Sequence, residues 1–105
     1  MSKNIAKHYQ MVKEQFPEYL EAVERLGEIA KDQGPIDEKR TQLLQLAASI
    51  AIKSEGATHS HTKRALEAGA SKAEIRHVVL LLSNTIGFPA VMAGLTWVND
   101  ILDAK

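Results

Sequence analysis

The residues best suited to chemistry gather between Ser54 and Gly69, where two histidines stand among hydroxyl and cationic side chains. Such a polar stretch is unusual between two apolar helices, and it indicates a site. His61 has two interpretations: a partly buried helix residue that is hydrogen-bonded to a carbonyl, or the centre of that site. Imidazole titrates near neutral pH, so the second interpretation would supply a general acid or base.

The segment before this stretch carries a polar stripe that points toward Ser54. Its members, Gln42, Gln45 and Ser49, recur at three- and four-residue steps and so share one face of a helix. The spacing is equally compatible with a face that meets water and with one that lines a pocket. Both interpretations stay open at this point.

The histidines do not predict a metal centre. Residues two apart on a helix point about 200° from each other, so His59 and His61 cannot easily hold one ion unless the turn there is extended. His8 and His77 have no partner that the sequence identifies, and we assign them no role. We expect neither a metal nor a cofactor.

Composition excludes several classes of function. The chain has no cysteine, which rules out thiol redox chemistry, disulfides and iron–sulfur ligation within it. Thirteen basic and thirteen acidic residues cancel, so nucleic acid and anionic membranes are not favoured partners. The longest apolar run, Val78 to Leu82, is too short to span a bilayer, and the N-terminus shows no signal-type core. We expect a cytoplasmic protein.

Residues that typically start or end helices occur along the whole chain and predict a helical protein. A first helix is expected over Lys3 to Gln15, and a second begins at Pro17 and stops near Gly34-Pro35. The apolar residues of this second helix recur at helical steps, which predicts an amphipathic face. They are Tyr19, Leu20, Val23, Leu26, Ile29 and Ala30.

The remaining helices are marked at both ends. Asp37 is a candidate N-cap for a helix that runs to Lys53, and Ser71 with Glu74 forms a candidate capping box after Gly69. The helix from Ser71 is so apolar, with Leu80 and Leu81 widening its face, that we expect it to be almost wholly buried. Gly87-Phe88-Pro89 breaks it and starts the last helix. The prediction is a single all-α domain of about six helices over residues 1–105.

Three stretches occur in a specific order and spacing: Gln42-Leu43-Leu44, then His61 followed by Ala65-Leu66-Glu67-Ala68-Gly69-Ala70, then Gly87-Phe88-Pro89-Ala90. With them, the chain from about Asp37 to Leu95 resembles the carboxymuconolactone decarboxylase family, which also contains the AhpD-type alkylhydroperoxidases. The resemblance implies an AhpD-like helical domain with its core at residues 37–104 and its N-terminal helices at 1–34. It also implies a homo-oligomer, typically a trimer or hexamer. Trp97, the only tryptophan, is expected to be a packing anchor at a subunit contact rather than a platform for a ligand.

In the hydroperoxidase branch the site resembles Cys-x2-Cys-x3-His, with a glutamate one helix upstream. Counted back from His61, the two cysteine positions fall on Ser54 and Ala57, and the glutamate position falls on Gln42. Peroxide reduction needs a low-pKa thiolate and a second, resolving thiol, which serine and alanine cannot replace. We therefore disfavour alkylhydroperoxidase activity.

The decarboxylase branch, which works without the cysteine pair, remains. The resemblance places His61 at the centre of the site with Gln42 and Ser54, where it would deliver the proton that quenches the carbanion left by carbon dioxide. His59, Lys53 and Arg64, or Lys63, would hold a small carboxylated lactone or related acid. The alternative is a non-catalytic helical oligomer that binds a small ligand or a partner protein.

Overall fold

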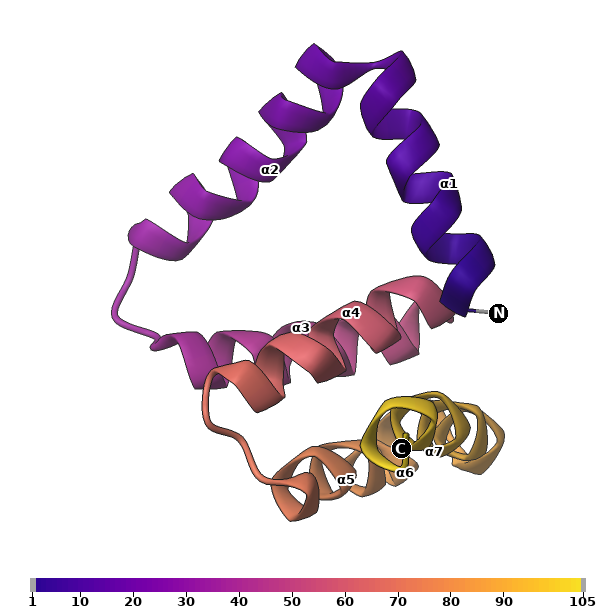
Figure 1. The fold of residues 1–105 in the computed structure, drawn as a ribbon. Helices are drawn as coiled ribbons and strands as arrows, with labels where there is room; N and C mark the ends of the chain where they lie inside the picture. Colours follow the sequence, from indigo (N-terminus) through magenta and orange to yellow (C-terminus); the bar gives the residue numbers. More distant parts are fainter. Residues whose placement is uncertain (1, 105) are drawn as a thin grey trace. The chain divides into compact units, whose positions relative to one another are not determined.

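The structure is a computed structural model that describes the backbone of residues 2–104 and the side chains of residues 7–104. Every regular element in this range is a helix, which confirms the all-α prediction. Contacts divide the chain into two compact units, Met1–Ile36 and Asp37–Lys105. Figure 1 shows α1 and α2 in the first unit and α3 to α7 in the second.

The first unit is a pair of helices, α1 (Ser2–Gln15) and α2 (Pro17–Asp32). Pro17 occupies the first turn of α2, where its missing N–H leaves no carbonyl without a partner. The hydroxyl of Tyr9 in α1 donates a hydrogen bond to Glu24 Oε2 in α2 at 2.9 Å. Leu20 is buried, but the other residues of the predicted apolar face stay accessible, with Leu26 67% exposed. Among residues 7–36 of this unit, Leu20 is therefore the one buried hydrophobic side chain.

The second unit begins with two antiparallel neighbours, α3 (Glu38–Ala51) and α4 (Glu55–Glu67). Asp37 caps α3 by accepting from the Arg40 backbone N–H at 2.9 Å, and Ser54 caps α4 by accepting from that of Ala57 at 3.2 Å. Between them Lys53 takes a left-handed conformation with φ of 60°, and the N–H of Ser54 bonds to the carbonyl of Ser49. This closes the C-terminus of α3 and turns the chain sharply into α4.

A capping box starts α5 (Lys72–Leu81), because Ser71 and Glu74 each accept a hydrogen bond from the other's backbone N–H. Lys39 Nζ lies 2.8 Å from Glu74 Oε2, and this bond, followed by the Ser71 N–H, holds the pKa of Glu74 below its ordinary value of 4.5. The predicted capping arrangement is confirmed.

The predicted helix from Ser71 to Ile86 is interrupted. It ends at Leu81, and a short helix, α6 (Ser83–Ile86), leads to α7 (Phe88–Leu102). The expectation that Leu80 and Leu81 would be buried is wrong, since they are 52% and 63% exposed. A continuous apolar run places hydrophobic side chains on all sides of a helix. Within this unit, however, other helices pack against one side of α5, so Leu80 and Leu81 on the other side stay exposed.

The core of the second unit lies where α3, α4, α5 and α7 meet, and it is built from small aliphatic side chains. Close approach of α7 depends on Gly94, where an added Cβ would lie 2.9 Å from Ile50 Cγ2 and 3.2 Å from Val79 Cγ1. The buried apolar residues are Leu46, Ile50, Ala65, Ala70, Ile75, Val79, Val91, Val98 and Leu102. Within residues 2–104, no helix is long and apolar enough to cross a membrane.

Candidate functional site

Gln42 and His61 meet between α3 and α4. Oε1 of Gln42 lies 2.8 Å from Nδ1 of His61, and Gln42 has no exposed surface, whereas His61 is half-buried. A buried polar side chain needs its hydrogen bonds inside the protein, because no water replaces them. The bond therefore holds the imidazole against α3.

Glu38 determines how the Gln42 amide is turned. Nε2 of Gln42 donates to Glu38 Oε1 at 2.8 Å, one helical turn upstream on α3. A carboxylate only accepts, so the amide nitrogen must face Glu38 and the amide oxygen must face His61. Since that oxygen is also only an acceptor, Nδ1 of His61 carries the hydrogen, and Nε2 holds the lone pair of the neutral ring.

Hydroxyl groups line the contact between the same two helices. Thr58 Oγ1 donates to the Ser54 carbonyl at 2.7 Å and lies 3.0 Å from Oγ of Ser49, which in turn donates to the Leu46 carbonyl at 2.7 Å. Ser49 and Thr58 are buried, and Thr62 is buried and donates to the Thr58 carbonyl. Each hydroxyl has a backbone carbonyl as acceptor on its own helix, and the contact between Ser49 and Thr58 places α4 directly against α3.

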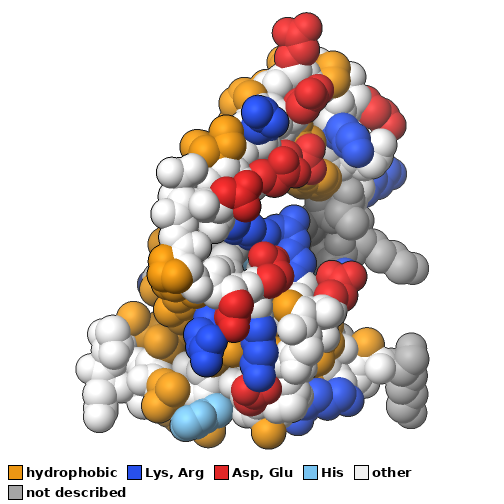
Figure 2. All heavy atoms as spheres, turned by 90° about the vertical axis from the view of Figure 1, so that its left-hand side faces the viewer, with side chains coloured by type: hydrophobic (Ala, Val, Ile, Leu, Met, Phe, Trp, Pro, Cys, Tyr) orange, Lys and Arg blue, Asp and Glu red, His pale blue; other side chains and the backbone are white. Residues whose placement is uncertain are grey.

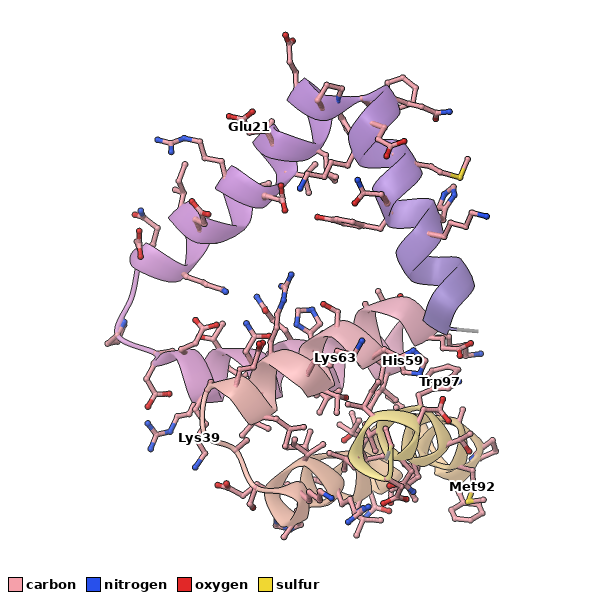
Figure 3. All side chains as sticks on the ribbon, viewed as in Figure 1. Glu21, Lys39, His59, Lys63, Met92 and Trp97 are labelled. Atoms are coloured by element: carbon pink, nitrogen blue, oxygen red, sulfur yellow. The ribbon has the colours of Figure 1, made fainter. Side chains whose placement is uncertain are left out.

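His59 leaves α4 on another side and contacts α7. Its Nε2 lies 3.0 Å from Oδ2 of Asp100 and 3.9 Å from Oε2 of Glu55, while only 4% of the residue is exposed. Asp100 must accept, so the hydrogen of the neutral His59 ring is on Nε2, and buried Nδ1 has no hydrogen-bond partner among the described residues. His59 and His61 are thus held in opposite tautomers. Figure 3 labels His59 on α4 and Trp97 on α7.

Glu55, His59 and Asp100 form a cluster whose nitrogen and oxygen atoms all lie within 4.8 Å of one another. The 3.0 Å contact already pairs His59 with Asp100, and Glu55 sits one turn before His59 on the same helix. We interpret the cluster as a hydrogen-bonded group that ties α4 to α7, because Nε2 of His59 is engaged by a carboxylate in the described arrangement. The histidine thereby serves packing between helices.

The predicted site residues divide into those that meet and those that do not. Gln42 and His61 are brought together, and Ser54 lies at the start of the same helix, where its hydroxyl serves as the N-cap. His59 faces α7 and is buried. The cationic residues Lys53, Lys63 and Arg64 are exposed. In Figure 3 the labelled Lys63 lies on α4, one turn after His59.

The sequence analysis did not identify three acidic partners, Glu38, Glu55 and Asp100. Glu38 lies four residues before Gln42, a spacing at which side chains meet on a helix, so a local signal for this pair was present. Glu55 has the same relation to His59. Asp100 had no local signal, because it is 41 residues from His59 and depends on the packing of α7.

The comparisons with known proteins agree with this architecture. A carboxymuconolactone decarboxylase family protein from Legionella pneumophila, crystallised in its apo form, superposes with a TM-score of 0.83 over 97% of this chain and 91% of its own, at 19% identity. An uncharacterized protein from Methanocaldococcus jannaschii is 32% identical over 84 residues, which cover 80% of this chain and 78% of that protein. The sequence model of the carboxymuconolactone decarboxylase family matches residues 17–100 of this chain. This chain therefore belongs to the carboxymuconolactone decarboxylase family.

Proposed function

We propose that the protein is a lyase that removes carbon dioxide from a small carboxylated lactone or a related acid, with His61 as the general acid and base. Membership of the family supports this reaction class. The hydrogen bond between Gln42 and His61 supports His61 as the acid–base residue. It orients a half-buried imidazole and uses Nδ1, which leaves proton transfer to Nε2.

The chemistry assigns a task to each ring nitrogen. Cleavage of the bond between carbon and the substrate carboxylate leaves the electron pair on that carbon, where a neighbouring carbonyl of the substrate delocalises it. His61 is the imidazolium at this stage, having taken a proton at Nε2 from water, and it gives that proton to the carbon, which leaves the neutral ring with hydrogen on Nδ1. Nδ1 keeps its hydrogen and its bond to Gln42 in both protonation states, so Nε2 is the ring atom that exchanges the proton.

The substrate carboxylate needs a cation or a set of N–H donors. Arg64 is the best candidate among the predicted residues, because it lies three residues after His61 and therefore on a neighbouring part of the α4 surface. Lys63 and Lys53 are exposed alternatives on and before the same helix. The function proposed needs no metal or cofactor, since a carbonyl of the substrate serves as the electron sink.

The test is a screen of small carboxylated lactones and β-keto acids for release of carbon dioxide. We expect turnover by the wild type and a fall of about 10²- to 10⁴-fold in His61→Gln. His77→Gln, at an exposed histidine of α5, is the matched control and should retain full activity. Equal turnover by the wild type and His61→Gln would remove the assigned role.

We also propose that the chain works as a homo-oligomer, a trimer or hexamer. The support is the exposed apolar face of α2, where Tyr19 and Leu26 are 65% and 67% accessible, together with exposed Leu81 and Phe88 in the second unit. Figure 2 shows hydrophobic side chains on the surface among intermixed acidic and basic ones. Association would bury such groups, whereas the balance of thirteen basic and thirteen acidic residues does not favour nucleic acid as a partner.

The same exposed face favours one rival, a non-catalytic helical oligomer that binds a small ligand or a partner protein. In that case the bond between Gln42 and His61 would only stabilise the packing of α3 on α4. The screen above separates the two, because the rival has no turnover to lose. Thiol-based peroxide reduction is not a rival, since the chain has no cysteine.

A further inference from the structure

We propose that Glu38 is a positioning residue for His61, acting through Gln42, and that it determines which nitrogen of the neutral ring is the base. The catalytic importance of this role rests on the function proposed above. The first test described below measures the tautomer of His61 and does not depend on that function. It starts from two hydrogen bonds in series, from Gln42 Nε2 to Glu38 Oε1 and from His61 Nδ1 to Gln42 Oε1, each 2.8 Å long.

The orientation of both hydrogen bonds is determined by Glu38, because it is the one group of the three that can act only as an acceptor. The ionised carboxylate of Glu38 offers acceptors alone, whereas the amide of Gln42 has a donor end and an acceptor end, and the imidazole can place its hydrogen on either nitrogen. Glu38 therefore orients the amide, and the amide selects the tautomer. Gln42 has no exposed surface, so in the folded chain its amide depends on Glu38 and His61 for its hydrogen bonds.

Loss of the carboxylate would free the amide to turn over. A reversed Gln42 would present its NH₂ group to Nδ1, which would then have to accept, and the hydrogen of the neutral ring would move to Nε2. A neutral ring with hydrogen on Nε2 cannot take a proton at that atom. Glu38 thus keeps Nε2 able to accept a proton, although Gln42 separates it from the imidazole.

The neighbouring charges on α3 and α4 are consistent with this role. Arg40 pairs with Asp37 at 2.8 Å, and Lys39 pairs with Glu74 at 2.8 Å, so the two cations next to Glu38 in the sequence are directed to other carboxylates. Glu55 lies beside His59, on another side of α4 from the bond between Gln42 and His61. Among these acidic residues, Glu38 is the one bonded to Gln42.

The test measures the tautomer of His61 directly. Ring ¹⁵N chemical shifts are recorded by NMR on the full chain at a pH above the titration of its histidines, and His61→Gln assigns the signals. In the wild type we expect hydrogen on Nδ1 of His61 and on Nε2 of His59, whose bond to Asp100 serves as an internal reference. Hydrogen on Nε2 of wild-type His61 would overturn the proposal.

Three variants then isolate the part played by Glu38. Glu38→Ala should shift the His61 tautomer toward Nε2–H, while Glu38→Gln, which keeps an acceptor oxygen without the charge, should retain more of the wild-type form. Glu67→Ala removes an exposed carboxylate from the last turn of α4 and should change neither histidine. The same His61 tautomer in Glu38→Ala as in the wild type would overturn the proposal, and Glu38 is exposed, so the variant should fold.

Kinetics distinguish a failure of this inference from a failure of the proposed function. If a substrate is found, Glu38→Ala should lower kcat by about 10- to 100-fold with little change in KM, a smaller loss than that of His61→Gln. If the wild type turns over no substrate, the proposed function fails, yet the NMR result still decides the role of Glu38. Unchanged kcat in a variant with an altered tautomer would show that the tautomer does not matter for the reaction.

Discussion

The amide oxygen of Gln42 lies 2.8 Å from Nδ1 of His61, and this single contact joins two helices through one wholly buried and one half-buried side chain. Gln42 uses both ends of its amide, since its nitrogen donates to Glu38. It is therefore the residue on which both the packing of α3 against α4 and the orientation of the imidazole depend.

Truncation of Gln42 should be costly for stability. Gln42→Ala leaves a cavity and removes two hydrogen bonds from charged or ionisable partners, so we expect a loss of about 2–4 kcal/mol in the free energy of unfolding. Gln45→Ala, on the same helix at a partly buried position, is the matched control and should cost under about 1 kcal/mol. Urea titrations followed by circular dichroism measure both, and equal losses would contradict the burial argument.

The pair formed by His59 and Asp100 should contribute to the attachment of α7. Asp100→Ala leaves Nε2 of a buried histidine without its acceptor, and we expect a loss of about 1–3 kcal/mol. Asp100→Asn retains an acceptor oxygen and should lose less. Thermal unfolding compares them with Asp32→Ala, an exposed site in α2 that should change stability by under about 0.5 kcal/mol. An Asp100→Ala protein as stable as that control would show that the pair adds nothing.

Two glycines in helices should respond to alanine with opposite signs. At Gly94 a Cβ would lie 2.9 Å from Ile50 Cγ2, so Gly94→Ala should destabilise by about 1–3 kcal/mol through overpacking. Gly27 in α2 has nothing within 4 Å of the added carbon, and Gly27→Ala should stabilise by up to about 1 kcal/mol through helix propensity. Chemical denaturation gives both values. The interpretation fails if the two substitutions change stability in the same direction.

Stability should depend on pH through Glu74. Its pKa is lowered below 4.5 by Lys39 and then by the Ser71 N–H, so the folded state favours the ionised carboxylate. That stabilisation is present above pH 4.5 and is lost as the pH falls through the lower, folded-state pKa. The stability difference between the wild type and Glu74→Gln should therefore narrow from about pH 7 to about pH 3. A difference between the wild type and Glu74→Gln that widened in acid would have the wrong sign and would contradict this prediction.

The exposed face of α2 should determine assembly if the chain forms oligomers. Leu26→Lys places a charge where an interface would bury an apolar side chain, so we expect a smaller particle by size-exclusion chromatography with light scattering. Glu28→Gln changes the net charge by the same amount at an exposed site of the same helix and should leave the mass unchanged. A wild-type monomer would contradict the proposed assembly, and an intact oligomer in Leu26→Lys would move the interface elsewhere.

Helix boundaries were predictable from the sequence because their signals are local. Pro17, Asp37 and the pair of Ser71 and Glu74 act on backbone groups within one turn, and each lies at the predicted helix start. The exposure of Leu81 was not predictable in the same way, because it depends on which sides of α5 have neighbours. A periodic pattern cannot supply that information for a helix that is apolar all round.

The site was predictable only in part, for a related reason. The resemblance to a family predicted that Gln42 and His61 lie together. The helical spacing alone left Gln42 equally compatible with a face that meets water and with one that lines a pocket. Asp100 is 41 residues from His59, and only the packing of α7 on α4 brings it near. Tertiary contacts of this kind leave no trace in local spacing.

The left-handed backbone of Lys53 helps to fix the rotation of α4 about its own axis relative to α3. Only residues 52–54 separate α3 from α4, and one of them has a backbone conformation that side-chain-bearing residues adopt reluctantly. If a residue inserted there were taken up into the first turn of α4, every later residue of that helix would turn by about 100° about its axis. Each helix would survive, yet both imidazoles on α4 would then face new neighbours, so the length of this connection helps to determine which side chains of α4 meet α3.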